Sequence, residues 1–470
     1  MYKITDIRVE TIKKIIAFVA ALITIIICLL PMDDLPLWNG EIPSHRNQYE
    51  LMAEVILDGR IDFAYGDEGE LETLKNPYDP KERKESGVKY HWDHAYYDGH
   101  YYMYFGIVPV FLAFLPYRII TGTALTTFRA TQLFTAVIIA GIFSLFWLLS
   151  KLFFKKMKFG LYLSLSVAFS VMSVWYAMAE PALYCTAITA AIALEIWSIF
   201  FYIRAVYFEK NENKQILLAG IGALFGALVF GCRPPIALAN IVVIPLLIVF
   251  IKEHPFSRKL AGKLALAATP YLLVAAGLMI YNYVRFDNPF EFGQAYQLTV
   301  ADQSNYSLSI NGTNLLRLVK KTASNFFSFR SITKTFPYFQ TSSVFFNFPI
   351  LLFSVIALFP PVSERAKKTK TFPFLIGLVI SVLVITAVDV LWSPYLLERY
   401  RMDIYFLIGI GCFLALGMWY EESRNKKWLS VLIYSLSIVT VVSAFLLYIR
   451  TVGVYYPDKI KEFTNILGLQ

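Results

Sequence analysis

Long apolar runs, repeated along the whole sequence, restrict most strongly how this chain can fold. Each is close to or above the roughly 18 residues that cross a ~30 Å hydrocarbon core. Because 57% of the residues are hydrophobic and only 16% are charged, no soluble domain of ordinary size is left between the runs. We therefore predict an all-α polytopic membrane protein of about eleven transmembrane helices, forming one module over residues 1–470. The runs are 15–30, 127–151, 159–177, 183–207, 215–232, 235–251, 261–284, 342–360, 372–391, 402–420 and 428–450.

Basic residues gather in alternate connectors between these runs, and this pattern predicts the topology. Such connectors stay in the cytoplasm by the positive-inside rule. The rule places the N-terminus in the cytoplasm and two long polar loops, 32–126 and 285–341, on the outer face. The net charge of +9 is explained by this arrangement, so we expect membrane lipids and no nucleic acid as partners.

The run 104–121 contains Pro109 and Pro116 and is long enough to be mistaken for a further span. If it crossed the membrane, every later basic connector would lie outside. We therefore expect a juxtamembrane helix on the outer surface. A true span with an inverted charge pattern is the alternative.

The chemistry is expected in the first outer loop, where 91–106 combines acidic, imidazole and aromatic side chains. Asp93 is the main candidate: its carboxylate would act as a general base toward a hydroxyl, or hold a divalent cation, Mg²⁺ or Mn²⁺, together with His91. The sequence does not choose between these roles. His94 and Tyr102 are candidate substrate-binding residues, although interfacial anchoring also explains the tyrosines. For Asp98 we favour a solvated loop charge.

Several arginines are expected at the outer ends of the helices, where a lipid phosphate would lie. Arg233 occupies a short Gly-Cys-Arg-Pro-Pro turn, and guanidinium groups suit bidentate contact with phosphate. Snorkelling to ordinary headgroups is the competing interpretation for this residue. Arg285, Arg399 and Arg401 extend the predicted phosphate group, with intramolecular salt bridges as the alternative for the last two. Further substrate-binding candidates are Glu180 and Glu291.

Other motifs of known chemistry are missing from the sequence. It contains no phosphate-binding G-x-x-x-x-G-K-[ST] loop and no H-E-x-x-H zinc motif. The four cysteines lie within or beside apolar runs without metal-type spacing, which favours a packing role.

The motifs of the first loop resemble those of the GT-C superfamily, polytopic glycosyltransferases that use polyprenyl-phosphate sugars. The similarity is strongest to bacterial members, and it rests on a shared plan and on moderately specific motifs over most of the chain. These motifs are Asn47-Gln48-Tyr49, Asp58-Gly59, Pro77-Tyr78-Asp79-Pro80, Trp92-Asp93, the aromatic run 101–106, the segment 283–293, and Glu398-Arg399-Tyr400 with Asp403.

The resemblance implies an inverting transfer of a sugar from a polyprenyl phosphate to an acceptor hydroxyl of a glycan, lipid or protein on the outer face of a bacterial plasma membrane. A first-loop carboxylate would serve as the base. Many relatives have an acid near the start of the first-loop helix, where this chain has Asn47, so Asp33, Asp34 and Asp93 are all candidate bases. Asn47 itself is a candidate substrate-binding residue.

A transporter or flippase for lipid-linked saccharides is the alternative function. It would also need arginines and interfacial aromatics, but inverted repeats and deep polar groups would be expected. The sequence shows no repeat, and its polar residues gather at the outer face. A structural protein without catalysis is a third interpretation, which leaves the clustered acids and imidazoles unexplained.

Overall fold

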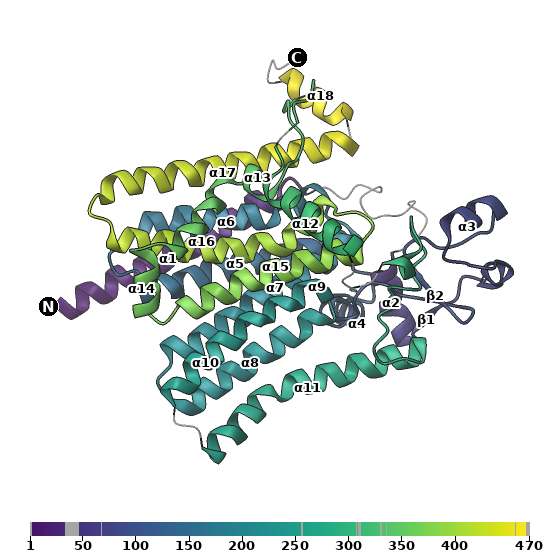
Figure 1. Ribbon diagram of the computed structural model, residues 1–470, viewed down its shortest axis with the longest axis horizontal. Helices are drawn as coiled ribbons and strands as arrows, with labels where there is room; N and C mark the ends of the chain where they lie inside the picture. Colours follow the sequence, from purple (N-terminus) through teal and green to yellow (C-terminus); the bar gives the residue numbers. More distant parts are fainter. Residues whose placement is uncertain are drawn as a thin grey trace.

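The protein is a bundle of long helices with a smaller polar part at one end (Figure 1). The computed structural model describes residues 2–32, 47–66, 68–254, 257–306, 308, 312–329, 331–334, 336–455 and 457–466. Among these residues, ten helical segments are long and apolar enough to span a membrane, and a bent pair makes a possible eleventh. The long helices are α1 (Tyr2–Leu29), α5 (Thr127–Phe153), α6 (Phe159–Ala179), α7 (Leu183–Ile203), α8 (Glu212–Phe230), α10 (Val243–Glu253, preceded by the short α9, Pro234–Ala237), α11 (Arg258–Phe286), α15 (Phe372–Trp392), α16 (Met402–Glu422) and α17 (Lys426–Tyr455). The predicted all-α polytopic fold is confirmed.

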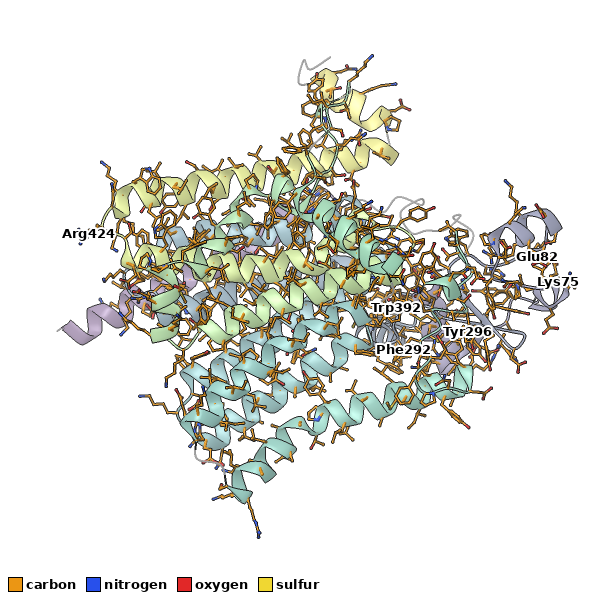
Figure 2. All side chains as sticks on the ribbon, in the orientation of Figure 1. Lys75, Glu82, Phe292, Tyr296, Trp392 and Arg424 are labelled. Atoms are coloured by element: carbon orange, nitrogen blue, oxygen red, sulfur yellow. The ribbon has the colours of Figure 1, made fainter. Side chains whose placement is uncertain are left out.

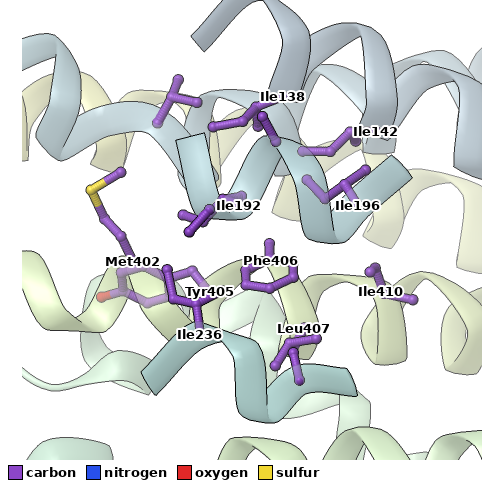
Figure 3. Close-up of a cluster of buried hydrophobic side chains, with 14 of the residues drawn as sticks. Ile138, Ile142, Ile192, Ile196, Ile236, Met402, Tyr405, Phe406, Leu407 and Ile410 are labelled. Carbon is purple, nitrogen blue, oxygen red and sulfur yellow. The ribbon is translucent and has the colours of Figure 1, made fainter. Parts of the chain in front are cut away.

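The bundle has a tightly packed centre and two exposed flanks. Branched and aromatic side chains of α5, α7, α9 and α16 interlock in the centre, among them Ile138, Ile192, Ile236 and Phe406 (Figure 3). Helices α11 and α17 lie on opposite sides of the bundle (Figure 1). They leave many leucine, isoleucine and valine side chains exposed, as expected where lipid is the solvent.

The predicted run 342–360 differs from the other spans. It forms a short helix α13 (Val344–Asn347), a 3-10 segment over Pro349–Leu358 and helix α14 (Val362–Lys368), with a bend of 64° between the last two. Prolines at 349, 360 and 361 remove backbone donors and prevent one continuous α-helix. The segment still runs alongside α16: Asn347 donates to the Tyr405 hydroxyl at 3.2 Å, and Arg365 bonds to Glu421 at 3.4 Å. These end contacts support counting it as an eleventh span.

Charged connectors meet at one end of the bundle. Lys151 pairs with Glu10 at 2.6 Å, and Lys370 pairs with Glu253 at 2.5 Å. Arg424 lies at this end, and Trp392 lies at the other, next to the polar part (Figure 2). The predicted grouping of the basic connectors at a single end is therefore present.

The polar part is built mainly from the first predicted loop. It contains α2 (Gln48–Leu57), α3 (Pro80–Ser86) and a small antiparallel sheet of β1 (Asp62–Phe63), β3 (His100–Tyr102) and β2 (Ala95–Tyr97), in that order. Asp98 and Gly99 have φ of 48° and 75° and form the two-residue turn between β2 and β3. Asp98 is thus an exposed turn residue, which agrees with the solvated loop charge favoured for it.

The run 104–121 does not form a full span. Its helical part, Val110–Thr121, comprises a π-helical turn and α4 (Leu115–Thr121), and it is shorter than the ~20 residues that a crossing needs. The helix leaves Ile119 and Ile120 exposed, 64% and 82%, as expected for a helix in contact with the membrane surface.

The second predicted loop packs against the first. Helix α11 is followed by Asp287, whose φ is 53°, and the next segment pairs with β2, just after the turn that carries Asp93. The amide of Leu298 donates to the His94 carbonyl, and the Asp93 amide donates to the Leu298 carbonyl, both at 2.9 Å. Farther on, α12 (Gly312–Phe327) and, beyond α17, α18 (Pro457–Ile466) complete the described elements.

Candidate active site

A cavity of about 350 Å³ lies where the two polar segments cover the end of the bundle. Phe292 and Trp392, both in its lining, lie close together at this junction (Figure 2). Lining residues come from the Trp92–Asp93 and Tyr104–Gly106 segments, from α7, from the 232–235 turn, from 292–303, from the end of α15 and from 397–400. The cavity brings together three of the residues predicted from the sequence, namely Asp93, Arg233 and Arg399.

Asp93 is held firmly in the cavity wall. Its backbone φ of 59° is in the left-handed region, which aspartate tolerates better than most residues. One carboxylate oxygen accepts a hydrogen bond from Gln297 at 3.0 Å, and the other accepts one from the Tyr184 hydroxyl. The side chains of Thr299 and Trp92 also hydrogen-bond to this carboxylate. Asp93 is therefore held in one orientation in the cavity wall.

Burial controls the protonation of Asp93. The residue is only 3% exposed, and the resulting desolvation raises the pKa of its carboxyl above the ordinary value. The Tyr184 hydrogen bond and the charge of Arg399 act in the opposite direction and favour the carboxylate. A carboxylate with a raised pKa is a stronger proton acceptor once it is ionised, as a general base requires.

Arg399 presents a guanidinium to the cavity beside Asp93. It lies over the Tyr184 ring at 4.0 Å and over the Tyr400 ring at 5.6 Å. Within the part of the chain that the structure describes, it has neither an ion pair nor a hydrogen bond, so the salt bridge considered for it with Glu398 or Asp403 is not formed. The aromatic rings fix the cation but leave its donors for an anion.

Arg233 is positioned by acids from two other helices. Its Nε bonds to Asp403 at 2.7 Å, one terminal nitrogen lies 4.0 Å from Asp389, and the guanidinium lies 4.8 Å over the Tyr400 ring. Arg233 is therefore held by these acids at the end of the bundle, and its side chain does not extend freely toward lipid headgroups. Because the cavity still exposes part of its side chain, a donor group remains for a ligand.

A close backbone approach brings the first loop to Arg233. A Cβ atom at Gly106 would lie 2.2 Å from the carbonyl oxygen of Gly231, and the Val108 amide donates to that carbonyl at 2.9 Å. Only glycine allows this contact. The Tyr-Phe-Gly motif therefore joins the loop to the turn that carries the arginine.

The two histidines predicted near Asp93 do not line the cavity. His91 stacks on Tyr65 with ring centroids 3.5 Å apart, and His94 bonds to the Tyr65 hydroxyl at 2.8 Å and to the Trp92 carbonyl at 2.9 Å. Burial lowers the pKa of His94 to about 3, so this ring is neutral at physiological pH. Both imidazole rings therefore pack against Tyr65 and stabilise the segment that leads into β2.

A divalent cation does not fit the predicted pair. Asp93 faces the cavity, whereas His91 is held against Tyr65 outside its lining. Among the described residues, no group of three or more histidine, cysteine, aspartate or glutamate side chains is arranged to hold a metal ion. We therefore derive no step through Mg²⁺ or Mn²⁺.

Other predicted substrate-binding residues lie outside the cavity lining. Arg285 is 5% exposed and donates to the Met103 carbonyl and to the Asn282 side chain, both at 2.8 Å. Arg401 donates to Asn325 at 3.0 Å. These contacts anchor the loops, and they use guanidinium donors that the sequence analysis assigned to phosphate.

Asn47 and Tyr102 also have structural contacts. The Asn47 side chain accepts from the first amides of α2 and donates to Thr127 at 2.9 Å, so it caps the helix and fastens it to α5. Tyr102 packs against Phe286 beneath the sheet. Neither lines the cavity.

The remaining acids are placed differently. Glu291 accepts from the Gly293 amide at 2.7 Å and shapes a turn, away from the cavity lining. Glu180 lies at the end of α6, near enough to Arg399 to interact electrostatically, with one buried oxygen that has no hydrogen-bond partner among the described residues. Asp33 and Asp34 lie outside the described residues.

The structure adds polar residues that the sequence analysis did not assign to the site, above all Tyr184, Gln297 and Asp389. Tyr184 and Gln297 carry no distinctive motif, and only their contacts with Asp93 reveal them. Asp389 is different, since an acid inside an apolar run is a signal of function in its own right.

Comparisons with known proteins show a likeness in structure but none in sequence. No family model matches the chain, and no curated protein matches it. Among solved structures, the chain is similar to the oligosaccharyltransferase of Archaeoglobus fulgidus in its apo form, with 13% sequence identity and a TM-score of 0.41. The likeness covers 92% of this chain and 55% of the archaeal protein, so the chain spans about half the length of its match.

Proposed function

We propose that this protein is a membrane glycosyltransferase that transfers a sugar from a polyprenyl-phosphate donor to an acceptor hydroxyl, with inversion at the anomeric carbon. One observation carries the proposal: a buried carboxylate, Asp93, faces the same cavity at one end of a membrane bundle as the guanidinium of Arg399, which has no ion pair within the described part of the chain. A base and an anion-binding group on either side of the anomeric carbon are what the reaction requires.

Asp93 serves as the base in this proposal. Its carboxylate accepts the proton of the acceptor hydroxyl while the hydroxyl oxygen forms a bond to the anomeric carbon. The Tyr184 and Gln297 hydrogen bonds keep the carboxylate in one orientation, which preserves the distance to the acceptor. A positioned base of this kind typically contributes about 10²- to 10⁴-fold to the rate.

The arginines stabilise the leaving group. As the bond from the anomeric carbon to the phosphate oxygen breaks, the electron pair stays on the polyprenyl phosphate, and negative charge increases there. Arg399 offers this charge donors that no described residue occupies, and Arg233 adds a second cation held by Asp403. Cations fixed in a partly desolvated site stabilise such charge without reorganisation.

The test is a transfer assay with purified full-length protein. It uses a panel of polyprenyl-phosphate sugars with membrane glycan, lipid and protein acceptors, and it measures released polyprenyl phosphate. Wild-type protein and Asp98→Asn should release it, because Asp98 occupies an exposed turn, whereas Asp93→Asn should lose about 10²- to 10⁴-fold.

The flippase alternative is tested in the same experiment. If no donor yields free polyprenyl phosphate, but the reconstituted protein moves lipid-linked sugars across vesicles, the transferase proposal is wrong. Equal activity of Asp93→Asn and wild type would instead keep the enzyme and remove Asp93 as its base.

A further inference from the structure

A second cavity, of about 550 Å³, lies far along the bundle from the candidate active site, between α1, α5 and the end of α7. On α1 its lining begins at Lys14 and continues at one-turn intervals to Ile25. On α5 it extends in the same way from Ala140 to Lys151. Two facing stripes of this period mark a groove that follows the helix axes. We call it the basic-end groove.

Three cations from different elements meet at one end of this groove. Lys14 lies toward the start of α1, Lys151 lies at the end of α5, and Arg204 directly follows α7. Because α1 and α5 run in opposite directions, the start of one and the end of the other lie together, as the 2.6 Å pair of Lys151 with Glu10 confirms.

Two of the three cations are available to a ligand. Lys151 is engaged by Glu10 and by the Trp147 ring at 4.6 Å. Lys14 and Arg204 are exposed, and neither has an ion-pair partner among the residues that the structure describes. Glu209 interacts electrostatically with Arg204, and Glu10 pairs with Lys151, so among the described residues two carboxylates face three cations and the mouth of the groove keeps a net positive charge.

The walls beyond the cations are apolar. Phe18 and Leu22 of α1 are 70% and 45% exposed, and they face aromatic side chains of α5 that include Phe143 and Trp147. A ligand that fills this groove thus needs a long apolar portion that follows the helices and a compact anionic group at the basic end.

We propose that the basic-end groove binds one anionic phospholipid, with its phosphate on Lys14 and Arg204 and an acyl chain between α1 and α5. Charge complementarity selects this occupant, since a zwitterionic lipid would bring its own cation to a site where Lys14 and Arg204 form no ion pair with a described residue. The site is separate from the Asp93 cavity, and the inference does not depend on the proposed transferase activity.

Fluorescence quenching by bromine-labelled lipids tests the proposal, because Trp147 lines the groove. Delipidated full-length protein in detergent is titrated with brominated phosphatidylglycerol or brominated phosphatidylcholine. The Trp147 contribution is taken as the difference between wild type and Trp147→Phe. Brominated phosphatidylglycerol should quench it at a clearly lower mole fraction than brominated phosphatidylcholine does.

Charge variants locate the headgroup. The double variant Lys14→Gln/Arg204→Gln should need about twenty-fivefold more phosphatidylglycerol for the same quenching, given roughly one fivefold step per basic residue. The matched control Lys155→Gln/Lys210→Gln removes two exposed cations that do not line the groove, and it should behave as wild type.

Three outcomes would overturn the proposal. Equal quenching by both lipids would show that the cations select no headgroup. A double variant that binds as wild type does would place the phosphate elsewhere. Loss of the Trp147 signal on self-association, measured by light scattering at rising protein concentration, would make the groove an interface between two copies.

Discussion

Replacing Tyr184 by phenylalanine should shift the acid limb of the activity profile to higher pH. The tyrosine hydroxyl donates to one carboxylate oxygen of Asp93, and its ring lies under the Arg399 guanidinium at 4.0 Å. Phenylalanine keeps the ring and removes only the donor. The substitution therefore tests the hydrogen bond and keeps the aromatic ring on which the Arg399 guanidinium lies.

The size of the effect follows from the contact. A hydrogen bond to a buried charged group contributes ~1.5–3 kcal/mol. It favours the carboxylate, so its loss raises the pKa of Asp93 further and favours the protonated form by about ten- to a hundredfold. A protonated Asp93 cannot accept a proton, and activity should therefore disappear at a higher pH than in wild type as the pH falls.

The assay is the release of polyprenyl phosphate measured across pH at saturating donor. The control is Tyr104→Phe, because Tyr104 lines the same cavity but donates to Gln294 at 2.7 Å and not to the carboxylate. The control should keep the wild-type acid limb whatever its overall rate. An acid limb that does not move in Tyr184→Phe would refute the assignment of Asp93 as the titrating base.

Four further substitutions distinguish residues that act in the proposed reaction from residues that stabilise the fold. Arg399→Gln should lower kcat about 10²- to 10³-fold with little change in thermal stability, because its donors are free for the leaving group; transfer kinetics and thermal unfolding check this. Arg285→Lys should lower the free energy of unfolding by ~1–3 kcal/mol, because the Met103 carbonyl and the Asn282 side chain lose their guanidinium donors. Its KM for the sugar donor should be unchanged, and the same two measurements check both expectations. Gly106→Ala should reduce the yield of folded protein in size-exclusion chromatography, since its Cβ would meet a carbonyl oxygen at 2.2 Å, whereas Gly69→Ala, with nothing within 4 Å, should not.

Periodicity and charge sign determined the membrane architecture. Ten of the eleven predicted runs are continuous spanning segments, and the eleventh is the bent 349–368 segment, where prolines override the apolar pattern. For 104–121 the basic connectors indicate a surface helix, whereas its hydropathy by itself would indicate a span.

Residue type alone could not separate site residues from supporting residues. Arg285 and Arg399 both lie at helix ends next to the polar part, yet Arg285 bonds to the Met103 carbonyl and the Asn282 side chain, whereas Arg399 faces the cavity. His91 and His94 were predicted beside Asp93 because they are its neighbours in sequence. The left-handed backbone at Asp93 and the backbone hydrogen bonds of 93–96 with 296–298 direct these side chains to different sides.

The sequence by itself therefore determined where lipid must surround the chain and at which end of the bundle polar chemistry gathers, because the energetic cost of charge in hydrocarbon acts on composition and order. Only the tertiary structure decided that Asp93, Arg233 and Arg399 share one cavity with Tyr184 and Gln297. These residues come from distant segments, and their meeting depends on packing such as the contact of Gly106 with Gly231, which no local pattern encodes.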